Sequence, residues 1–510
     1  MTAIVETRQG KVRGHSVQGV QVFRGLRYAD TTAGANRFRA PQPLPAWAGV
    51  RDALRNTPAC PQLARPQNTD PFFSWYSAIE STDEDCLGLN LFTPGLDGAR
   101  RPVLFWIHGG GWREYSGAAP GFDGTNLARA EDVVVISINH RLGVLGFLKL
   151  DTEDERFADS GNAGILDVVA ALEWVRDNVA AFGGDPDNVT VFGESGGASK
   201  TAALLSMRRA RGLFHKAVLQ SSGGGMRLAS PEDAGALARQ LADALGRDRL
   251  DPQEMQALPV GTILEATRRV GGSFRGMIDH RSFDGDPFGD TAPAAGAGVP
   301  LLAGCTLTET TYYMRSDARN FALSWDDTRR RLSALFETDG DATDRIIDSY
   351  RQSTPGASAS DVLFLASSDF VFKRNTWRMA ALQAEQAPVW SYHFEWCSPV
   401  EGGRMGAPHT CEIPFIFGTT DAAGACVGEG PEQEAMTRRM MATWAAFART
   451  GDPNNDSLPD WPRYDGTARQ TMVLDATPRV ERDPGGAARA SLDGLPWFGY
   501  FHNLAAIANG

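Results

Sequence analysis

The pentapeptide Gly193-Glu-Ser-Gly-Gly197 limits the possible folds of this chain more than any other feature, because of what surrounds it. It follows the β-branched run Asn188–Phe192 and precedes a helical run that extends to Leu205. A chain with 55 glycines can contain Gly-x-Ser-x-Gly by chance, but chance does not also supply the strand and the helix. A serine on such a turn needs neighbours without bulk, and the turn raises its hydroxyl clear of the backbone. The pattern predicts that Ser195 is a nucleophile at the carboxyl edge of a sheet.

A second glycine-rich segment, His108-Gly-Gly-Gly111, follows another apolar run at 102–107. A glycine run after a strand is, by itself, most often an ordinary loop. Beside a nucleophile turn, it supplies a flexible backbone whose amides can face an oxyanion. We therefore expect Gly110 and Gly111, together with Gly196 at the start of the following helix, to donate the N–H groups of an oxyanion hole.

The rest of the chain alternates between short apolar runs and helical periodicity, which is typical of an α/β fold with a mostly parallel sheet covered by helices on both faces. Runs that are apolar almost throughout predict strands buried on both sides. The expected strands are 102–107, 133–139, 188–192, 299–303 and 389–394, and the expected helices are 165–182 and 431–450.

No repeat, low-complexity tract or Gly/Pro-rich linker divides the sequence, which favours a single domain over residues 1–510. The stretch from roughly 225 to 375 is mostly helical and polar by pattern. We expect it to be an insertion that covers the upper edge of the sheet.

Charge and cysteine usage exclude several classes of function. Fifty Lys and Arg against 62 Asp and Glu give a net charge of -12, which repels phosphate backbones, so no nucleic-acid partner is expected.

No segment approaches the roughly 18 apolar residues of a membrane span, and no signal peptide is visible, so we expect a cytoplasmic protein. The six cysteines form no Cys-x-x-Cys pair, and His409, Cys411 and Glu412 lack the spacing of zinc hydrolases, so no metal or other cofactor is expected.

Taken together, the motifs resemble the type-B carboxylesterases, which include the cholinesterases and bacterial carboxylesterases. The resemblance spans nearly the whole chain and is carried by the segments 23–29, 37–38, 84–90, 108–111, 139–143, 182–190, 193–197, 213–217, 406–409, 412–418 and 451–454. It implies an α/β-hydrolase fold, with a large mostly parallel central sheet flanked by helices and helical insertions over an active-site gorge. It also implies hydrolysis of carboxylic esters.

The resemblance assigns the two remaining members of a catalytic triad. The family's histidine lies in a Gly-Ala-x-His segment, which matches His409, and its acid matches Glu309. Where the family usually has an acidic residue before that glutamate and a glycine after it, this chain has Thr308 and Thr310. An exposed Glu309 with no catalytic part is therefore the competing interpretation.

Other positions depart from the family or match its structural features. Arg27, His140 and Gly196 replace a usual proline, tyrosine and alanine, and none of these changes removes a catalytic group. The resemblance further implies a structural ion pair between Arg37 and Glu84, and it matches Cys60 and Cys86 to the family's first disulfide loop. Whether these two cysteines form a bridge or remain thiols stays open.

Three residues are candidates for the substrate pocket. Glu194, beside the nucleophile, can tune His409 or a cationic substrate, or it can belong to a structural hydrogen-bond network, which we favour. Trp75 is a candidate by position, because the same loop of cholinesterases contributes a tryptophan that binds quaternary ammonium, although aromatics in such loops more often pack. Trp112, directly after the glycine run, is expected to shape the acyl pocket.

The sequence thus predicts an enzyme that hydrolyses small-molecule carboxylic esters through an acyl-enzyme, as a monomer or small homo-oligomer. An amidase, a carbamate hydrolase or an acyltransferase with the same triad remains an alternative. A cholinesterase-like binding protein without catalysis fits less well, because such proteins typically lack the nucleophile or its base, and both Ser195 and His409 are present.

Overall fold

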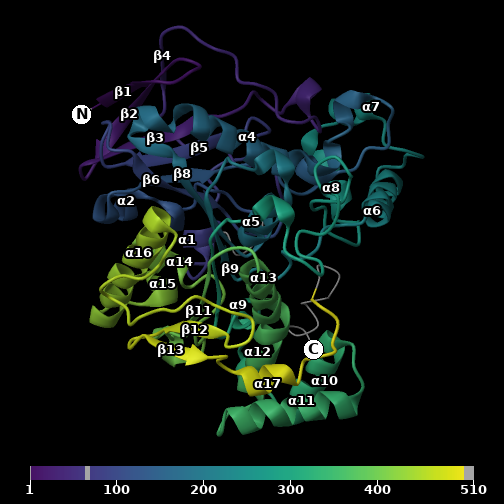
Figure 1. Ribbon diagram of the computed structural model, residues 1–510. Coiled ribbons are helices and arrows are strands. Elements are labelled where there is room, and N and C mark those ends of the chain that lie inside the picture. Colours follow the sequence, from purple (N-terminus) through teal and green to yellow (C-terminus); the bar gives the residue numbers. More distant parts are fainter. Residues whose placement is uncertain (1, 64–68, 499–510) are drawn as a thin grey trace.

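The structure is a computed structural model that describes residues 2–63 and 69–498. Its centre is a single large sheet that runs through the molecule in the order β1-β2-β3-β5-β7-β6-β8-β9-β10-β11-β12-β13, with β4 paired to β2 (Figure 1). The strands are β1 Thr2–Glu6, β2 Lys11–Val17, β3 Val20–Arg27, β4 Val50–Asp52, β5 Gly88–Thr93, β6 Arg101–Ile107, β7 Val134–Ile138, β8 Gly184–Glu194, β9 Lys216–Gln220, β10 Leu301–Thr306, β11 Val389–Phe394, β12 Gln470–Leu474 and β13 Arg479–Arg482.

The middle of the sheet is parallel and its edges are antiparallel. Every neighbouring pair from β7 to β12 is parallel, whereas the pairs among β1, β2, β3, β5 and β7 on one side, and β12 with β13 on the other, are antiparallel. Parallel strands all end at the same edge, so loops that follow β6, β8 and β10 meet there. This edge is where the sequence predicts the site.

Helices cover both faces of the sheet, as Figure 1 shows. They are α1 Ser74–Ser77, α2 Thr125–Glu131, α3 Gly143–Phe147, α4 Ala163–Asn178, α5 Gly196–Ser206, α6 Pro231–Ala244, α7 Pro252–Ala257, α8 Val260–Thr267, α9 Thr311–Met314, α10 Trp325–Phe336, α11 Gly340–Ser353, α12 Ala359–Ser368, α13 Arg374–Ala384, α14 Ile413–Phe417, α15 Gly424–Val427, α16 Pro431–Thr450 and α17 Gly486–Ala490.

Strand β6 shows why the sequence of a central strand is apolar almost throughout. Val103 and Phe105 belong to the buried cluster that contains α4 and α5, while Leu104 and Trp106 belong to the cluster that contains α2 and α16. Successive side chains of a strand point to opposite faces, so a strand covered on both sides has no solvent-exposed face that could carry polar side chains. The strand and helix predictions made from this pattern are confirmed, apart from differences of a few residues at their ends.

The prediction of one insertion over residues 225–375 needs correction. Strand β10, Leu301–Thr306, lies inside this range and pairs with β9 and β11 in the centre of the sheet. The helices around it therefore form two segments, α6 to α8 before the strand and α9 to α12 after it. The first segment follows the carboxyl end of β9 and the second follows that of β10. The chain returns to the sheet between them to form β10.

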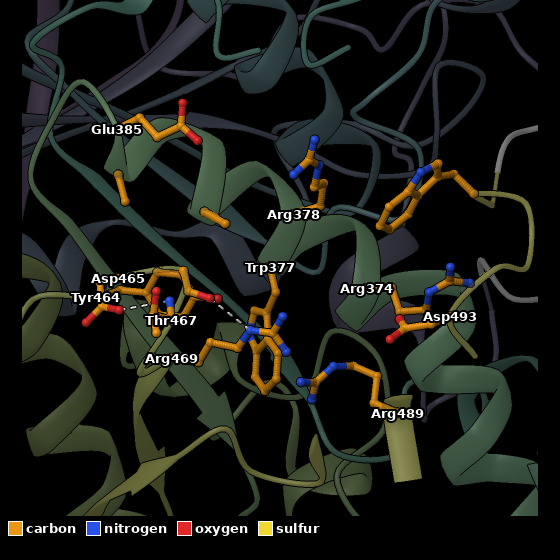
Figure 2. A pocket seen from close by; sticks show the side chains of 14 residues that line it. Arg374, Trp377, Arg378, Glu385, Tyr464, Asp465, Thr467, Arg469, Arg489 and Asp493 are labelled. Atoms are coloured by element: carbon orange, nitrogen blue, oxygen red, sulfur yellow. Dashed lines mark hydrogen bonds between the residues drawn. The ribbon is translucent and has the colours of Figure 1, made fainter. Parts of the chain in front are cut away.

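A cavity of about 520 Å³ opens between α13 and the loop before β12 (Figure 2). Its lining includes four arginines, Arg374, Arg378, Arg469 and Arg489. Two of them, Arg469 and Arg489, form ion pairs with Asp483. None of the residues that the sequence predicts for catalysis lines this cavity, so it is separate from the site described next.

Candidate active site

Ser195 lies at the sharp turn between β8 and α5. Its φ of 56° and ψ of -120° are a conformation that non-glycine residues rarely adopt, and its N–H is fixed by the carbonyl of Gln220 at 2.8 Å. The flanking glycines permit this turn: a Cβ on Gly197 would lie 2.0 Å from the carbonyl oxygen of Ile107, and a Cβ on Gly193 would lie 2.5 Å from the Gly197 carbonyl carbon. The packing of β6 against this turn therefore requires glycine.

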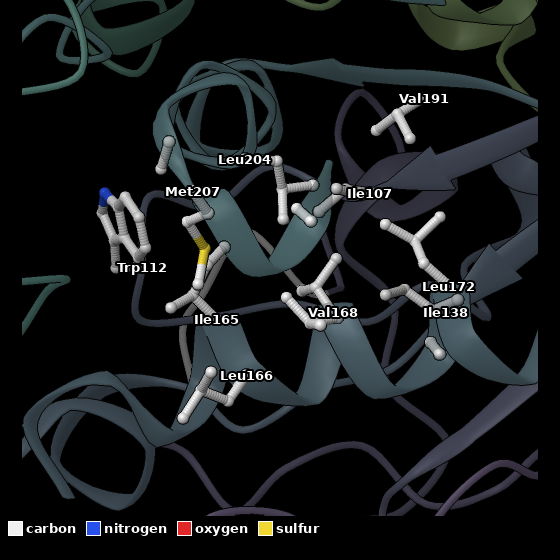
Figure 3. Close-up of a cluster of buried hydrophobic side chains, with 14 of the residues drawn as sticks. Ile107, Trp112, Ile138, Ile165, Leu166, Val168, Leu172, Val191, Leu204 and Met207 are labelled. Atoms are coloured by element: carbon white, nitrogen blue, oxygen red, sulfur yellow. The ribbon is translucent and has the colours of Figure 1, made fainter. Parts of the chain in front are cut away.

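Helix α5 holds the turn in place through the core beneath it. Figure 3 shows Leu204 and Met207, at the end of this helix, beside Ile165 and Val168 of α4, with Ile107 and Val191 of the sheet close by. All six side chains are buried in one cluster. The serine thus stands on a rigid support, although its own conformation is strained.

The glycine run after β6 lies against the start of α5. Gly110 and Gly111 have φ angles of 80° and 65°, and their N–H groups donate to no acceptor among the described residues. A Cβ on Gly196 would lie 2.0 Å from the carbonyl oxygen of Gly111, so the two segments are in contact. The chain has glycine at position 196 because alanine does not fit under the loop in this position. The glycines whose N–H groups the sequence predicts as oxyanion donors therefore lie on two segments that are in contact.

Glu309 and His409 are brought together by loops that follow β10 and β11. Glu309 is fully buried, and its Oε2 accepts a hydrogen bond of 2.5 Å from Nδ1 of His409. Its other oxygen, Oε1, accepts from the Ser221 hydroxyl at 2.6 Å and from the Thr306 N–H at 2.8 Å. These donors hold the carboxylate in one orientation, and the carboxylate in turn orients the imidazole.

The two threonines that depart from the family pattern are accommodated by hydrogen bonds. Thr308 Oγ1 donates to the Met405 carbonyl at 2.8 Å, and the N–H of Thr310 donates to Ser368 Oγ at 3.2 Å. The loop therefore keeps Glu309 inside the protein. The competing interpretation of an exposed Glu309 does not agree with this geometry.

Glu194 contacts the other side of the imidazole. Its Oε1 lies 3.1 Å from Nε2 of His409, and its Oε2 accepts a 2.9 Å hydrogen bond from the Tyr76 hydroxyl. Burial, and then the charge of Glu309, raise the pKa of Glu194 well above its usual range. No hydrogen bond joins the Ser195 hydroxyl to His409 among the described residues. Because Glu194 directly precedes Ser195, Nε2 nevertheless faces the segment that carries the nucleophile.

A third buried carboxyl group, Glu412, was not predicted to belong to the site. Its Oε1 accepts from Gln220 Nε2 at 3.0 Å, and Gln220 is itself bonded to the indole N–H of Trp444. Burial, and then the charges of Glu194 and Glu309, raise the pKa of Glu412 to about 8. The sequence places it three residues after His409, but only the fold brings it near the other two carboxyl groups. Ser221, Thr306 and Tyr76 were missed for the same reason.

The two tryptophans proposed for the substrate pocket are each only 2% exposed. The indole N–H of Trp75 donates to the Phe72 carbonyl at 2.9 Å, and Gly121 packs directly on the ring. Trp112 packs edge-on against Phe147. Both rings lie within the packed interior of this structure, and their place in a substrate pocket stays a prediction. The rings nearest to His409 are instead those of Tyr312, Tyr313 and Phe372.

The remaining features that the resemblance implies also lie outside the site. Arg37 and Glu84 form a two-point ion pair, with N–O distances of 2.5 and 2.6 Å. Cys60 and Cys86 are buried free thiols in this structure, and the hydrogen bond between them is the main cause that raises the pKa of Cys86, followed by burial.

The sequence model of the carboxylesterase family matches residues 1–489 of this chain. The chain belongs to the carboxylesterase family. Para-nitrobenzyl esterase of Bacillus subtilis (strain 168) is 34% identical to this carboxylesterase over 504 residues, which cover 96% of this chain and 98% of the relative. Phenmedipham hydrolase of Pseudarthrobacter oxydans is 36% identical over 505 residues, which cover 94% and 97%.

Solved structures agree with this result. A carboxylesterase from Geobacillus stearothermophilus has a TM-score of 0.84 to this chain at 38% identity, covering 96% of this chain and 100% of the other. The protein is a carboxylic ester hydrolase with the α/β-hydrolase fold, as the sequence predicts. Within residues 2–63 and 69–498, no helix combines the length and the apolar character needed to cross a membrane.

Proposed function

We propose that this carboxylesterase cleaves small-molecule esters with Ser195 as nucleophile, His409 as general base and Glu309 as the acid that orients it. The observation that carries the proposal is the 2.5 Å hydrogen bond between His409 Nδ1 and Glu309 Oε2. It commits the proton to Nδ1, which leaves Nε2 as the basic nitrogen on the side of the strand-to-helix turn.

The reaction begins when Nε2 of His409 takes the proton of the Ser195 hydroxyl and the serine oxygen attacks the ester carbonyl. The carbonyl oxygen becomes negative and accepts hydrogen bonds from the N–H groups of Gly110, Gly111 and Gly196. The C–O bond to the alcohol then breaks, and His409 returns the proton to the departing oxygen. A water molecule repeats these steps on the acyl-enzyme, which releases the acid and restores the serine.

The contact between Glu194 and His409 means that the imidazole must rotate before the first step. Oε1 of Glu194 contacts Nε2 at 3.1 Å, so the imidazole must turn from this carboxyl group toward the serine when substrate enters. Burial raises the pKa of Glu194, which favours its protonated form relative to a carboxyl group in water. Release of Nε2 from this contact is therefore part of the proposed first step.

Two variants test the triad. Ser195→Ala should abolish hydrolysis of p-nitrophenyl acetate and covalent labelling by a fluorophosphonate, located by peptide mass spectrometry. Glu309→Gln should lower kcat by about 10³- to 10⁴-fold with a small change in KM, because a neutral amide cannot stabilise the imidazolium. Ser206→Ala, at the other end of the same helix, serves as the control and should retain full activity. Labelling that persists in Ser195→Ala would contradict the proposal.

The nature of the bond cleaved needs a separate measurement. Rates on p-nitrophenyl esters of graded acyl length should exceed those on the matching p-nitroanilides, because p-nitrophenolate is a better leaving group than the anilide and an ester carbonyl is more electrophilic than an amide carbonyl. A preference for anilides would show that amide hydrolysis is the main activity.

A further inference from the structure

Lys200 is buried directly behind the proposed oxyanion loop. It lies on α5, five residues after the nucleophile, and its side chain has no exposure to solvent. Its ammonium group donates hydrogen bonds to the carbonyl oxygens of Gly111 at 2.8 Å and of His108 at 3.3 Å. These carbonyls flank the two amides that are expected to bind the oxyanion. One side chain is therefore hydrogen-bonded to both ends of the segment that carries the proposed oxyanion donors Gly110 and Gly111.

No described carboxylate balances the charge of Lys200. None of the ion pairs of residues 2–63 and 69–498 includes it, and burial alone lowers its pKa to about 7. The ring of Trp112 lies 5.7 Å from the ammonium, and the imidazoles of His108 and His140 stack on each other within the reach of its charge. Burial, and then the charge of Lys200, lower the pKa of both histidines, and their Nδ1 atoms are bonded to backbone carbonyls.

Burying an amine without an acidic partner disfavours folding, so stability does not account for this residue. The loop that it holds contains two consecutive glycines with positive φ, Gly110 and Gly111, which restrict the backbone very little. Oxyanion donors are effective only if they already point at the position where charge develops. Fixing such a loop is therefore of direct value to catalysis.

We propose that Lys200 is a positioning residue that holds the oxyanion loop in its catalytic conformation through the carbonyls of His108 and Gly111. The inference rests on the oxyanion hole of the proposed function. It also accounts for Gly196, because the Gly111 carbonyl that Lys200 holds occupies the space of a Cβ at position 196. A lysine amine keeps at least two N–H donors in either protonation state, so both hydrogen bonds can persist above neutral pH.

The test compares Lys200→Met, which keeps an unbranched side chain of nearly the same length without its donors, with Lys200→Gln, which restores a donor. Lys216→Met is the matched control, since Lys216 is a buried lysine of β9 that is bonded to Asn188. Lys200→Met should lower kcat for p-nitrophenyl acetate by about 10- to 100-fold, less than the loss of a direct oxyanion donor, with KM within about twofold. Lys200→Gln should recover part of the loss, and Lys216→Met should leave kcat unchanged.

A trifluoromethyl ketone provides a readout that a purely structural role would not change. Its tetrahedral adduct places an oxyanion in the hole, so its affinity should fall in Lys200→Met by the same factor as kcat/KM, while Lys216→Met binds it normally. Equal affinities in wild type and Lys200→Met would overturn the proposal. If Lys200→Met is recovered unfolded, Lys200→Gln decides: wild-type kcat and wild-type ketone affinity together would overturn the proposal, and a parallel loss would support it.

Failure of this inference can be distinguished from failure of the triad. Ser195 should still be labelled by a fluorophosphonate in every lysine variant, more slowly in Lys200→Met. If labelling is lost only in Ser195→Ala and Lys200→Met reacts at the wild-type rate, the triad stands and the positioning role does not.

Discussion

Three buried carboxyl groups lie close to one another in this site, and they differ in the number of hydrogen bonds that they accept. Glu309 accepts three hydrogen bonds, from an imidazole, a hydroxyl and a backbone N–H. Glu194 and Glu412 each accept one from a side chain. Like charges in a buried site disfavour one another, and together with burial this raises the pKa of Glu194 and of Glu412. Glu309 has the most donors, and these fix the orientation of the group that contacts His409.

The pKa of Glu412 makes the stability of the protein depend on pH. In the folded state its carboxyl group keeps its proton up to about pH 8, whereas in the unfolded chain it ionises near 4.5. Between these values the folded state binds more protons, so this contribution to the free energy of unfolding is complete below pH 4.5 and is lost as the pH rises through 8. Each pKa unit corresponds to about 1.4 kcal/mol.

We therefore expect Glu412→Gln, which cannot ionise, to raise the thermal midpoint relative to wild type by several degrees at pH 9 and little at pH 5. Scanning calorimetry at the two pH values measures the difference. Glu432→Gln, on the exposed first turn of α16, is the control and should shift the midpoint equally at both. A pH-independent effect of Glu412→Gln would show that the carboxyl group does not titrate as described.

At the scale of elements, the strand-to-helix turn from β8 to α5 is the feature that local sequence defines best. All its requirements lie within a few residues: a β-branched strand, a serine in a strained conformation, glycines on both sides and a helix of small residues. The partner that makes the glycines necessary is distant in sequence, since it is the end of strand β6. The sequence pattern therefore predicts the turn, and the contact with β6 explains why the turn needs glycine.

Gly197→Ala tests this explanation. The new Cβ would lie 2.0 Å from the Ile107 carbonyl oxygen, so β6 must move away from the turn. We expect a loss of about 3 kcal/mol in the free energy of unfolding and a decrease in kcat, because the oxyanion loop follows β6 directly. Urea unfolding and the rate on p-nitrophenyl acetate measure the two effects.

Gly235→Ala is the matched control for this prediction. Gly235 lies within α6, and a Cβ there would meet nothing closer than 3.5 Å. Alanine favours a helix over glycine by about 0.5–1 kcal/mol, so this variant should be slightly more stable than wild type. Equal losses in both variants would mean that the close approach at position 197 does not constrain the turn.

At the scale of the whole molecule, Arg37 connects the N-terminal part of the chain to the helical segment before β10. Besides Glu84, it donates to the carbonyls of Met255, Gln256 and Leu258, at 2.9, 3.1 and 2.7 Å. These carbonyls lie at and just after the end of α7, where the helix leaves them without partners. A single guanidinium therefore satisfies groups that are more than 200 residues away in sequence.

Arg37→Met should reduce the free energy of unfolding by about 3–5 kcal/mol, because it leaves a largely buried Glu84 and three carbonyls unpaired. The kcat of the folded fraction should stay unchanged, since Arg37 touches no residue of the proposed site. Arg156→Met removes an ion pair that is local and exposed, and it should shift the unfolding midpoint little. A large fall in kcat for folded Arg37→Met would link this ion pair to the site.

The sequence by itself determined the fold class, the central strands and the positions of the serine turn and the glycine loop. These features depend on periodicity and on short motifs, which are local properties of a chain. His409 and Glu309 were assigned by resemblance, because nothing in the spacing of two residues 100 positions apart predicts that they meet.

Only the tertiary structure decided the rest: that Glu309 is buried, that Tyr76 and Gln220 donate to the carboxyl groups beside it, and that Lys200 donates to the carbonyls of His108 and Gly111. It also showed that the strand predicted at 299–303 pairs in the centre of the sheet and divides the helical range around it into two segments. The physical reason is the same in each case. The partners come from different strands and helices, and their contacts exist only once the parallel strands align their carboxyl ends at one edge of the sheet.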